Sequence, residues 1–227
     1  MSTKGFDLDF SERFGALDDA KAAFVSKVYA TLSLSLIVTA AAAAWSAMNI
    51  SIASPSWALL RWAPLAMLFI AMFIRLSGPF GWVFLFAFVT VQGLVIGPIL
   101  TAYAALSGPY TVGYAAGLTA LIFLGLTAYV RISGKNFSYL GGFLWMATIG
   151  LLITGIALMF IGGPTAHYIY SWVGAALFSL WILYDTSKVT REHYQNNNVV
   201  GAVLNLYVDI INLFIFILSI VSGRSRN

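Results

Sequence analysis

Two aspartates in the C-terminal third are the residues best placed to do chemistry. Asp185 and Asp209 lie in otherwise apolar surroundings, and the triplet Asn196–Asn198, a strong turn signal, lies midway between them. We expect a helical hairpin that turns at this triplet. With one helix ending near His193 and the next beginning near Gly201, both carboxyl groups lie roughly 12 Å deep at 1.5 Å per residue.

Two neighbouring carboxyl groups in a poorly hydrated place cannot both ionise cheaply, and they titrate as one unit. We therefore predict that the pair shares a proton at neutral or acidic pH and loses it in alkaline conditions. Asn205 and Asn212 lie four before and three after Asp209, so the three form one supporting polar stripe. Arg75 is the nearest expected counter-charge. The alternatives are separate structural aspartates bonded to backbone or asparagine, and an Arg75 that only extends to the membrane surface.

Composition identifies the environment of this pair. Of the 227 residues 60% are hydrophobic and 9% charged, and the mean hydropathy is +0.89. A soluble domain carries about 25% charged residues, so lipid must cover most of this surface. The chain has no cysteine, phosphate-binding loop or nucleotide fingerprint, and its net charge of +4 is interpreted as topological rather than as a nucleic-acid signal.

Seven apolar stretches are long enough to cross a hydrocarbon core of about 30 Å, which predicts an all-α membrane protein with seven transmembrane helices. They run approximately over 28–48, 57–74, 81–103, 111–130, 140–161, 167–184 and 201–221. Residues 1–26 form a polar tail, 27–222 the membrane domain and 223–227 a short C-terminal tail. Pro64 and Gly97–Pro98 fall inside predicted spans, and a kink or local unwinding is expected at both because proline frees a carbonyl group.

The distribution of Lys and Arg predicts the orientation. Breaks two, four and six and the N-terminal tail hold nine of the 12 basic residues, whereas breaks one, three and five hold none. Because cytoplasmic loops are enriched in Lys and Arg, the N-terminus is expected in the cytoplasm. Seven crossings place Arg224 and Arg226 outside; a re-entrant last segment would reverse this, but the uninterrupted stretch 201–221 favours a full crossing.

Several segments resemble a known family. The segments are Gln92–Tyr103 (QGLVIGPILTAY), Lys135–Leu144 (KNFSYLGGFL), Leu183–Lys188 (LYDTSK) and Leu204–Phe214 (LNLYVDIINLF). With them the chain resembles the Bax inhibitor-1 family in a bacterial form, over nearly everything after the tail. The resemblance implies six helices around a central hydrophobic seventh, a location in the bacterial inner membrane and a pH-sensitive calcium leak. It also implies that Asp185 and Asp209 form the pH-sensing pair and that Arg75 pairs with the first aspartate.

The leading hypothesis is a calcium pore closed by the protonated pair, with calcium and protons as its ionic partners and no resident cofactor. Calcium prefers oxygen ligands, so Asp185 and Asp209 are possible calcium contacts. One alternative is an enzyme resembling intramembrane aspartyl proteases, which need two carboxyls of unequal acidity. Another is a regulator of cell death or stress that transports nothing. The sequence names no protein partner.

Overall fold

The structure is a computed structural model that describes residues 4–74, 76, 78–189, 191 and 194–224. All regular secondary structure in this part of the chain is helical, and loops join the helices. The elements are α1 (Lys4–Asn49), α2 (Pro55–Leu60), α3 (Ala63–Ala71), α4 (Gly78–Ser107), α5 (Thr111–Ser133), the short 3-10 turn η1 (Ser138–Leu140), α6 (Gly141–Ile161), α7 (Pro164–Lys188) and α8 (Val199–Arg224). The all-helical prediction is confirmed.

Six helical segments are long and apolar enough to cross a membrane, and the region Pro55–Ala71 is a shorter apolar helix pair. The single span predicted over 57–74 is therefore wrong as one helix. Ser54 begins α2 by accepting a hydrogen bond from the backbone N–H of Trp57 at 3.2 Å, and α2 ends at Leu60. Pro64 lies in the first turn of α3, where its missing N–H costs nothing, so the helix restarts there.

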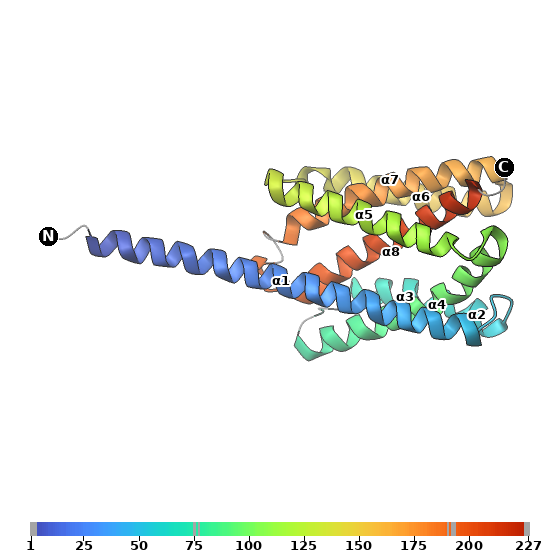
Figure 1. Ribbon diagram of the computed structural model, residues 1–227, viewed down its shortest axis with the longest axis horizontal. Helices are drawn as coiled ribbons and strands as arrows, with labels where there is room; N and C mark the ends of the chain where they lie inside the picture. Colours follow the sequence, from blue (N-terminus) through green and yellow to red (C-terminus); the bar gives the residue numbers. More distant parts are fainter. Residues whose placement is uncertain (1–3, 75, 77, 190, 192–193, 225–227) are drawn as a thin grey trace.

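The other proline lies inside a helix. The α-helix α4 continues through Pro98 without unwinding, and a kink there stays a prediction. The first helix also departs from its predicted bounds: α1 begins at Lys4, and its membrane-compatible part runs over Asp19–Asn49. The polar N-terminal stretch and the first span therefore form one helix, which protrudes from the rest of the bundle (Figure 1).

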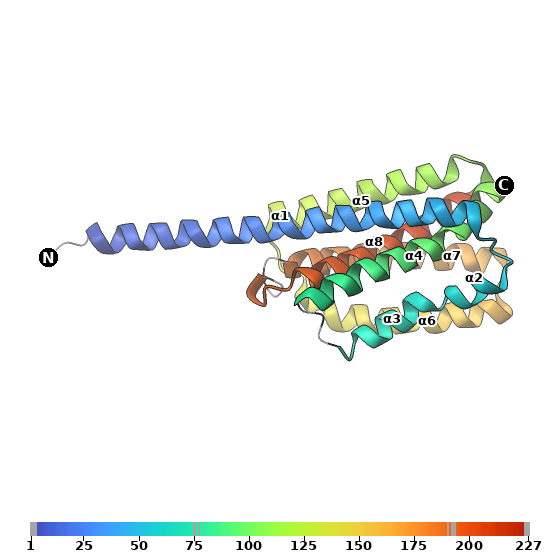
Figure 2. The same ribbon diagram turned by 90° about the horizontal axis from the view of Figure 1, so that it is seen from below.

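The helix α8 lies at the centre of the bundle. It packs against α1, α4, α5 and α7, and 56% of its most apolar window is buried, whereas the corresponding value for the span that contains α6 is 11%. Two views at right angles show α8 running between a layer that contains α1 and α4 and a layer that contains α6 and α7 (Figures 1 and 2). The helix that carries Asp209 is therefore far more buried than the span that contains α6.

The layer opposite α7 is held by close backbone contact. A side chain at Gly93 would place its Cβ 2.5 Å from the carbonyl O of Thr39, so α4 approaches α1 as closely as glycine allows. The Thr39 hydroxyl oxygen lies 3.1 Å from the carbonyl oxygen of Val89 and 2.6 Å from the Tyr207 hydroxyl oxygen, and in the second pair either hydroxyl can donate. One buried hydroxyl thereby joins α1, α4 and α8.

The two chain ends lie at opposite ends of the bundle (Figure 1). We call the end that holds the Asn196–Asn198 turn the turn end, and the other the C-terminal end. The helix α8 runs from one to the other without interruption, as expected for a full crossing. Large apolar side chains such as Met159, Phe160 and Ile161 are largely exposed on α6, which suits contact with lipid.

Candidate functional site

The α7–α8 hairpin positions the candidate site, and its turn is where the sequence predicts it. Asn197 adopts a left-handed backbone conformation with φ of 47°, which asparagine tolerates better than most residues. Asn198 accepts a hydrogen bond from the backbone N–H of Gly201 at 2.8 Å and so begins α8. Asp185 and Asp209 each lie 12 positions from Asn197, one on each arm of the hairpin.

The structure brings the two aspartates together inside the bundle. Asp185 is 5% exposed and Asp209 is 4% exposed. The two carboxyl groups lie close enough to interact directly, and Asp185 is the charged neighbour that acts on Asp209. The Oδ2 atom of Asp209 has no hydrogen-bond partner within the described part of the chain. A hydrogen bond between two carboxyl groups requires a proton on one of them, so this contact depends on protonation.

The other predicted site residues have different positions. Asn205 and Asn212 are half-buried on α8, and Asn212 donates to the carbonyl of Val208 on its own helix at 2.8 Å. No hydrogen bond between described residues links either asparagine to Asp209, so their supporting role stays a prediction. Arg75 lies outside the described residues, and its pairing with Asp185 also stays a prediction.

Beyond the aspartates, the α7–α8 interface becomes apolar and then polar again. Ile182 and Leu213 are fully buried in the core between these helices. Next along α8, the ring of Phe216 packs against Phe178 at a centroid distance of 5.9 Å, and it lies where Gly174 leaves room for it. We call this set, Ile182, Leu213, Phe178 and Phe216, the apolar belt.

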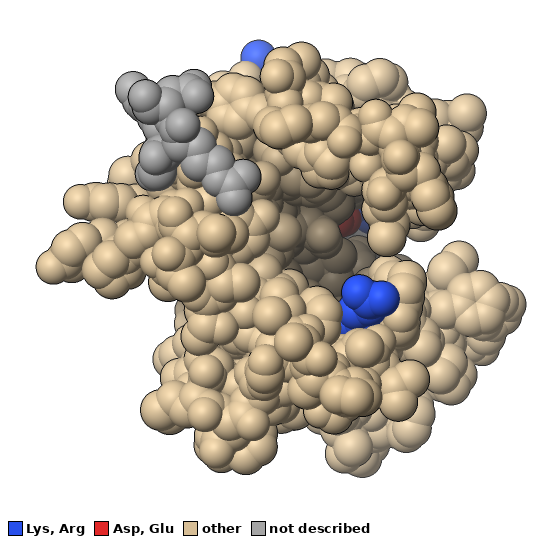
Figure 3. Space-filling model, turned by 90° about the vertical axis from the view of Figure 1, so that its right-hand side faces the viewer, with Lys and Arg blue, Asp and Glu red and all other residues tan. Residues whose placement is uncertain are grey.

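Two serine pairs follow the apolar belt at the C-terminal end. Ser171 of α7 lies 2.8 Å from Ser219 of α8 between hydroxyl oxygens, and Ser107 of α4 contacts Ser222 of α8. The interface around α8 therefore has a carboxyl pair toward one end and hydroxyl pairs at the other. Figure 3 views the C-terminal end and shows a hollow in this face, with an acidic side chain visible in its depth.

The match to a family model decides which family of membrane proteins this is. The model described as inhibitor of apoptosis-promoting Bax1 matches residues 21–226, which is most of the chain and includes both aspartates. The chain belongs to the Bax inhibitor-1 family. The resemblance of its motifs is thereby confirmed, and the six apolar helices agree with an integral membrane protein.

Relatives of this Bax inhibitor-1 family chain come from bacteria and eukaryotes. A membrane protein of Vibrio cholerae is 35% identical over 204 residues, covering 89% of this chain and 90% of that protein. The modulator of FtsH protease YccA of Escherichia coli is 35% identical over 149 residues, covering 66% and 67%. Bax inhibitor 1 of Schizosaccharomyces pombe is 31% identical over 217 residues, covering 90% and 78%. Their names describe an inhibitor and a modulator.

The site of this Bax inhibitor-1 family chain offers calcium few ligands. Among the described residues, no group of three or more His, Cys, Asp or Glu side chains lies close enough to hold a metal ion. Calcium takes six to eight oxygen ligands, so two carboxyl groups alone leave most of its coordination to water or backbone. Such an arrangement suits brief contact with a passing ion better than a resident one.

The sequence analysis missed the apolar belt and the serine pairs of this family member. A signal was present, because Ser219 follows Asn212 by seven positions, or two helical turns, and thus extends the polar stripe along α8. The place of Phe216 in that stripe carried no such signal. From sequence alone, Phe216 is an ordinary core residue; its special place becomes evident only in the structure, where it faces Gly174.

Proposed function

We propose that this chain is a pH-sensitive calcium leak channel of the bacterial inner membrane, closed when Asp185 and Asp209 share a proton. The observation that carries the proposal is the burial of both carboxyl groups at one contact between α7 and α8. We infer that the N-terminus and the turn end face the cytoplasm, because Arg131, Lys135 and Arg191 of the breaks lie at the turn end.

Loss of the shared proton supplies the force that opens the channel. Two unit charges about 4 Å apart repel by roughly 4 kcal/mol at an effective dielectric constant of about 20. Since 1.4 kcal/mol corresponds to a tenfold change in an equilibrium, repulsion of this size changes the balance of closed and open states by orders of magnitude. Alkaline conditions therefore separate α7 from α8 at the aspartates and increase the leak.

The ion path runs along α8 from the hollow at the C-terminal end to the aspartates. The apolar belt, in particular the ring of Phe216 against Gly174 and Phe178, is the barrier that must part. The α2–α3 pair is the seventh membrane-embedded segment, and its 17 residues cover about 25 Å at 1.5 Å per residue. Its main helix contact is α4, so it can move without disturbing the α7–α8 interface.

Calcium flux into liposomes tests the proposal. The purified protein is reconstituted into vesicles that contain a calcium dye, and the leak is recorded as external pH is raised. We expect wild-type leak to rise with pH. Asp185→Asn together with Asp209→Asn removes the titration, so the leak becomes independent of pH. Asp19→Asn, which changes an exposed acid on α1, is the matched control and keeps the wild-type response.

If the double asparagine variant leaks and responds to pH as the wild type does, the aspartate pair does not control the channel. If wild-type protein leaks at no pH, transport itself is excluded. That second outcome would favour the non-transporting regulator.

The E. coli relative supports a second function that needs no ion flux. YccA is named for modulating the FtsH protease, and it shares 35% identity over 66% of this chain. By this likeness, our chain would bind the FtsH protease and change the rate at which FtsH degrades its substrates. The test is degradation of a membrane substrate by purified FtsH in proteoliposomes, with and without this chain. An unchanged degradation rate would exclude this function and leave the channel proposal intact.

A further inference from the structure

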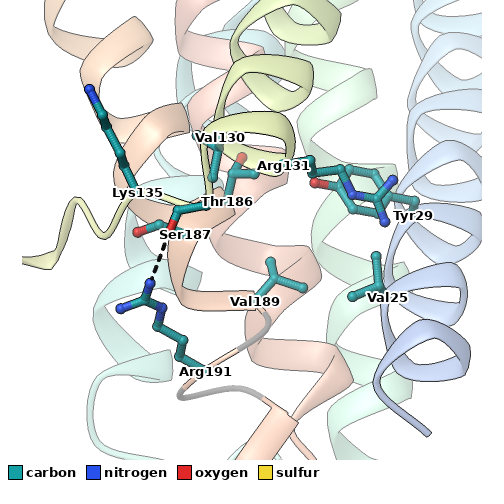
Figure 4. A pocket seen from close by; sticks show the side chains of 10 residues that line it. Val25, Tyr29, Val130, Arg131, Lys135, Thr186, Ser187, Val189 and Arg191 are labelled. Carbon is teal, nitrogen blue, oxygen red and sulfur yellow. Dashed lines mark hydrogen bonds between the residues drawn. The ribbon is translucent and has the colours of Figure 1, made fainter. Parts of the chain in front are cut away.

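A second cavity lies at the turn end, apart from the aspartate contact. It has a volume of about 230 Å³ and is bounded by α1, the end of α5 with its following loop, and the end of α7 (Figure 4). Three of its lining residues are basic, namely Arg131, Lys135 and Arg191, and the described lining contains no Asp or Glu. Its walls are otherwise apolar or hydroxyl-bearing.

The three basic side chains have neutral partners. The guanidinium of Arg131 lies 5.4 Å from the ring centre of Tyr29. Arg191 donates from Nη2 to the carbonyl of Gly134 at 3.3 Å, and the Lys135 amine is 3.5 Å from the Tyr129 hydroxyl. In the described ranges no carboxylate pairs with any of the three.

A buried hydroxyl group also lines the cavity. Thr186 is 4% exposed, and its hydroxyl lies beside the hydroxyl of Tyr29 in the same lining. A hydroxyl group has one hydrogen and two lone pairs, so Thr186 keeps capacity for a ligand. Figure 4 shows Arg131 and Arg191 on opposite sides of Thr186, with the Lys135 side chain extending away from Arg191. Two guanidinium groups and one hydroxyl therefore surround the cavity, and Lys135 lies at its margin.

Membrane topology alone explains part of this pattern. Basic residues are expected at a cytoplasmic surface, and Arg191 also satisfies a carbonyl group just after the last turn of α5. Topology does not require basic residues from the end of α5 and its following loop and from the segment after α7 to line one cavity together with a buried hydroxyl group. The volume limits the ligand, because pockets for drug-sized molecules measure about 300–1,000 Å³. A single small anionic group fits this cavity.

We propose that the cavity binds a phosphate group, carried by the headgroup of an anionic phospholipid or present as free phosphate. Arg131 and Arg191 supply the charged donors, since guanidinium groups match phosphate oxygens with paired hydrogen bonds. Thr186 donates its hydroxyl hydrogen to the same group. The site does not depend on ion conduction, so it can be tested separately from the proposed channel.

Lipid retention tests the headgroup form of the site. The full chain is purified in a neutral detergent, titrated with phosphatidylglycerol or phosphatidylcholine, and analysed by native mass spectrometry. We expect selective retention of phosphatidylglycerol. Arg131→Ala with Arg191→Ala should weaken it about 25-fold, at about fivefold for each basic residue. Thr186→Val keeps the shape of the side chain and should weaken it severalfold.

The matched control is Lys21→Ala with Lys27→Ala. Both lysines are exposed on α1 outside the cavity lining, so this variant removes the same charge near the same end. We expect it to retain phosphatidylglycerol nearly as the wild type does. Equal losses in the two double variants would show general surface attraction and overturn the site. Thermal unfolding of each variant in detergent separates lost binding from lost folding.

Inorganic phosphate is the probe for the other possible ligand, a soluble phosphate ion. Its binding to the lipid-free protein is followed by phosphorus NMR line broadening, with the same variants. Retained phosphatidylglycerol that phosphate does not displace assigns the site to a lipid headgroup. Phosphate binding that requires Arg131 and Arg191, without lipid retention, assigns it to a soluble anion. If neither probe binds, the proposal is wrong.

Discussion

The α1–α4 interface and the α7–α8 interface each combine a glycine with polar contacts, but they differ in what the glycine faces and in which polar groups meet. Between α1 and α4, Gly93 and Gly97 let the backbones touch, and Ser46 donates to the carbonyls of Ala43 and Gly93 at 3.2 and 3.4 Å. Between α7 and α8, the corresponding glycine is Gly174. It faces the ring of Phe216 rather than a backbone, and the nearest polar contact between these helices is the Ser171–Ser219 pair. The carboxyl pair lies on the other side of the apolar belt.

This difference separates a fixed interface from one that can switch. Neutral hydroxyl-to-carbonyl bonds and backbone contact do not change with pH, so α1 and α4 should stay together in all conditions. In the proposed channel, the α7–α8 contact at the aspartates needs a proton between two acids, and the ring of Phe216 fills the gap at Gly174 farther along the same interface. On that proposal, one change in protonation parts the second interface and leaves the first intact.

The largest effect should come from filling the α1–α4 interface. Gly93→Ala places a methyl group 2.5 Å from the backbone of Thr39 and 2.7 Å from Ala42 Cβ, which a backbone can relieve only by moving. We expect the free energy of unfolding to fall by about 1–3 kcal/mol. Unfolding titrations in mixed micelles measure it. Gly117→Ala is the control, because nothing lies within 4 Å there, and it should gain up to about 1 kcal/mol.

A smaller effect is expected from Gly174→Ala, because the clash is with a ring that can rotate. The cost should be about 1 kcal/mol, and the displaced Phe216 should increase calcium leak even at acid pH. A double-mutant cycle with Phe216→Leu tests the assignment. Phe216→Leu should cost less in the Gly174→Ala background than in the wild type. Independent, additive costs would mean that this ring does not fill the gap.

The smallest effect should follow Ser219→Ala at the C-terminal end of the α7–α8 interface. Ser171 keeps its bond to the carbonyl of His167 at 2.8 Å, so only the contact between helices is lost. Such bonds average about 0.6 kcal/mol in membranes. We expect a slightly higher leak at every pH with the pH response unchanged. A changed pH midpoint would place the serine pair inside the switch, contrary to this account.

Much of the fold follows from hydropathy. Spans such as 111–130, 167–184 and 201–221 lie inside observed helices because a backbone in lipid must bond to itself. The helix break before Pro64 does not follow from hydropathy, because proline is tolerated inside a transmembrane helix when neighbouring groups satisfy the freed carbonyl. Helix α4 continues through Pro98, whereas α2 and α3 separate before Pro64, and nothing in the local sequence distinguishes the two cases.

For the site, the symmetry of Asp185 and Asp209 about Asn197 predicts equal depth, which stays a prediction. Helix α7 ends three residues after Asp185, whereas α8 begins ten residues before Asp209. Helix rotation could not be predicted, since it depends on packing against α1, α4 and α5 together. The ring of Phe216 opposite Gly174 is a consequence of that rotation. The place of Thr186 in the basic cavity is another, because its surroundings come from segments distant in sequence.

Infrared difference spectroscopy of the reconstituted protein tests the central claim most directly. Our account predicts that the carbonyl band of a protonated carboxylic acid disappears as pH rises, in step with the calcium leak, and that Asp185→Asn with Asp209→Asn lacks this band. If the leak rises while the band stays, or if the band persists in the double variant, the shared proton does not hold α7 and α8 together.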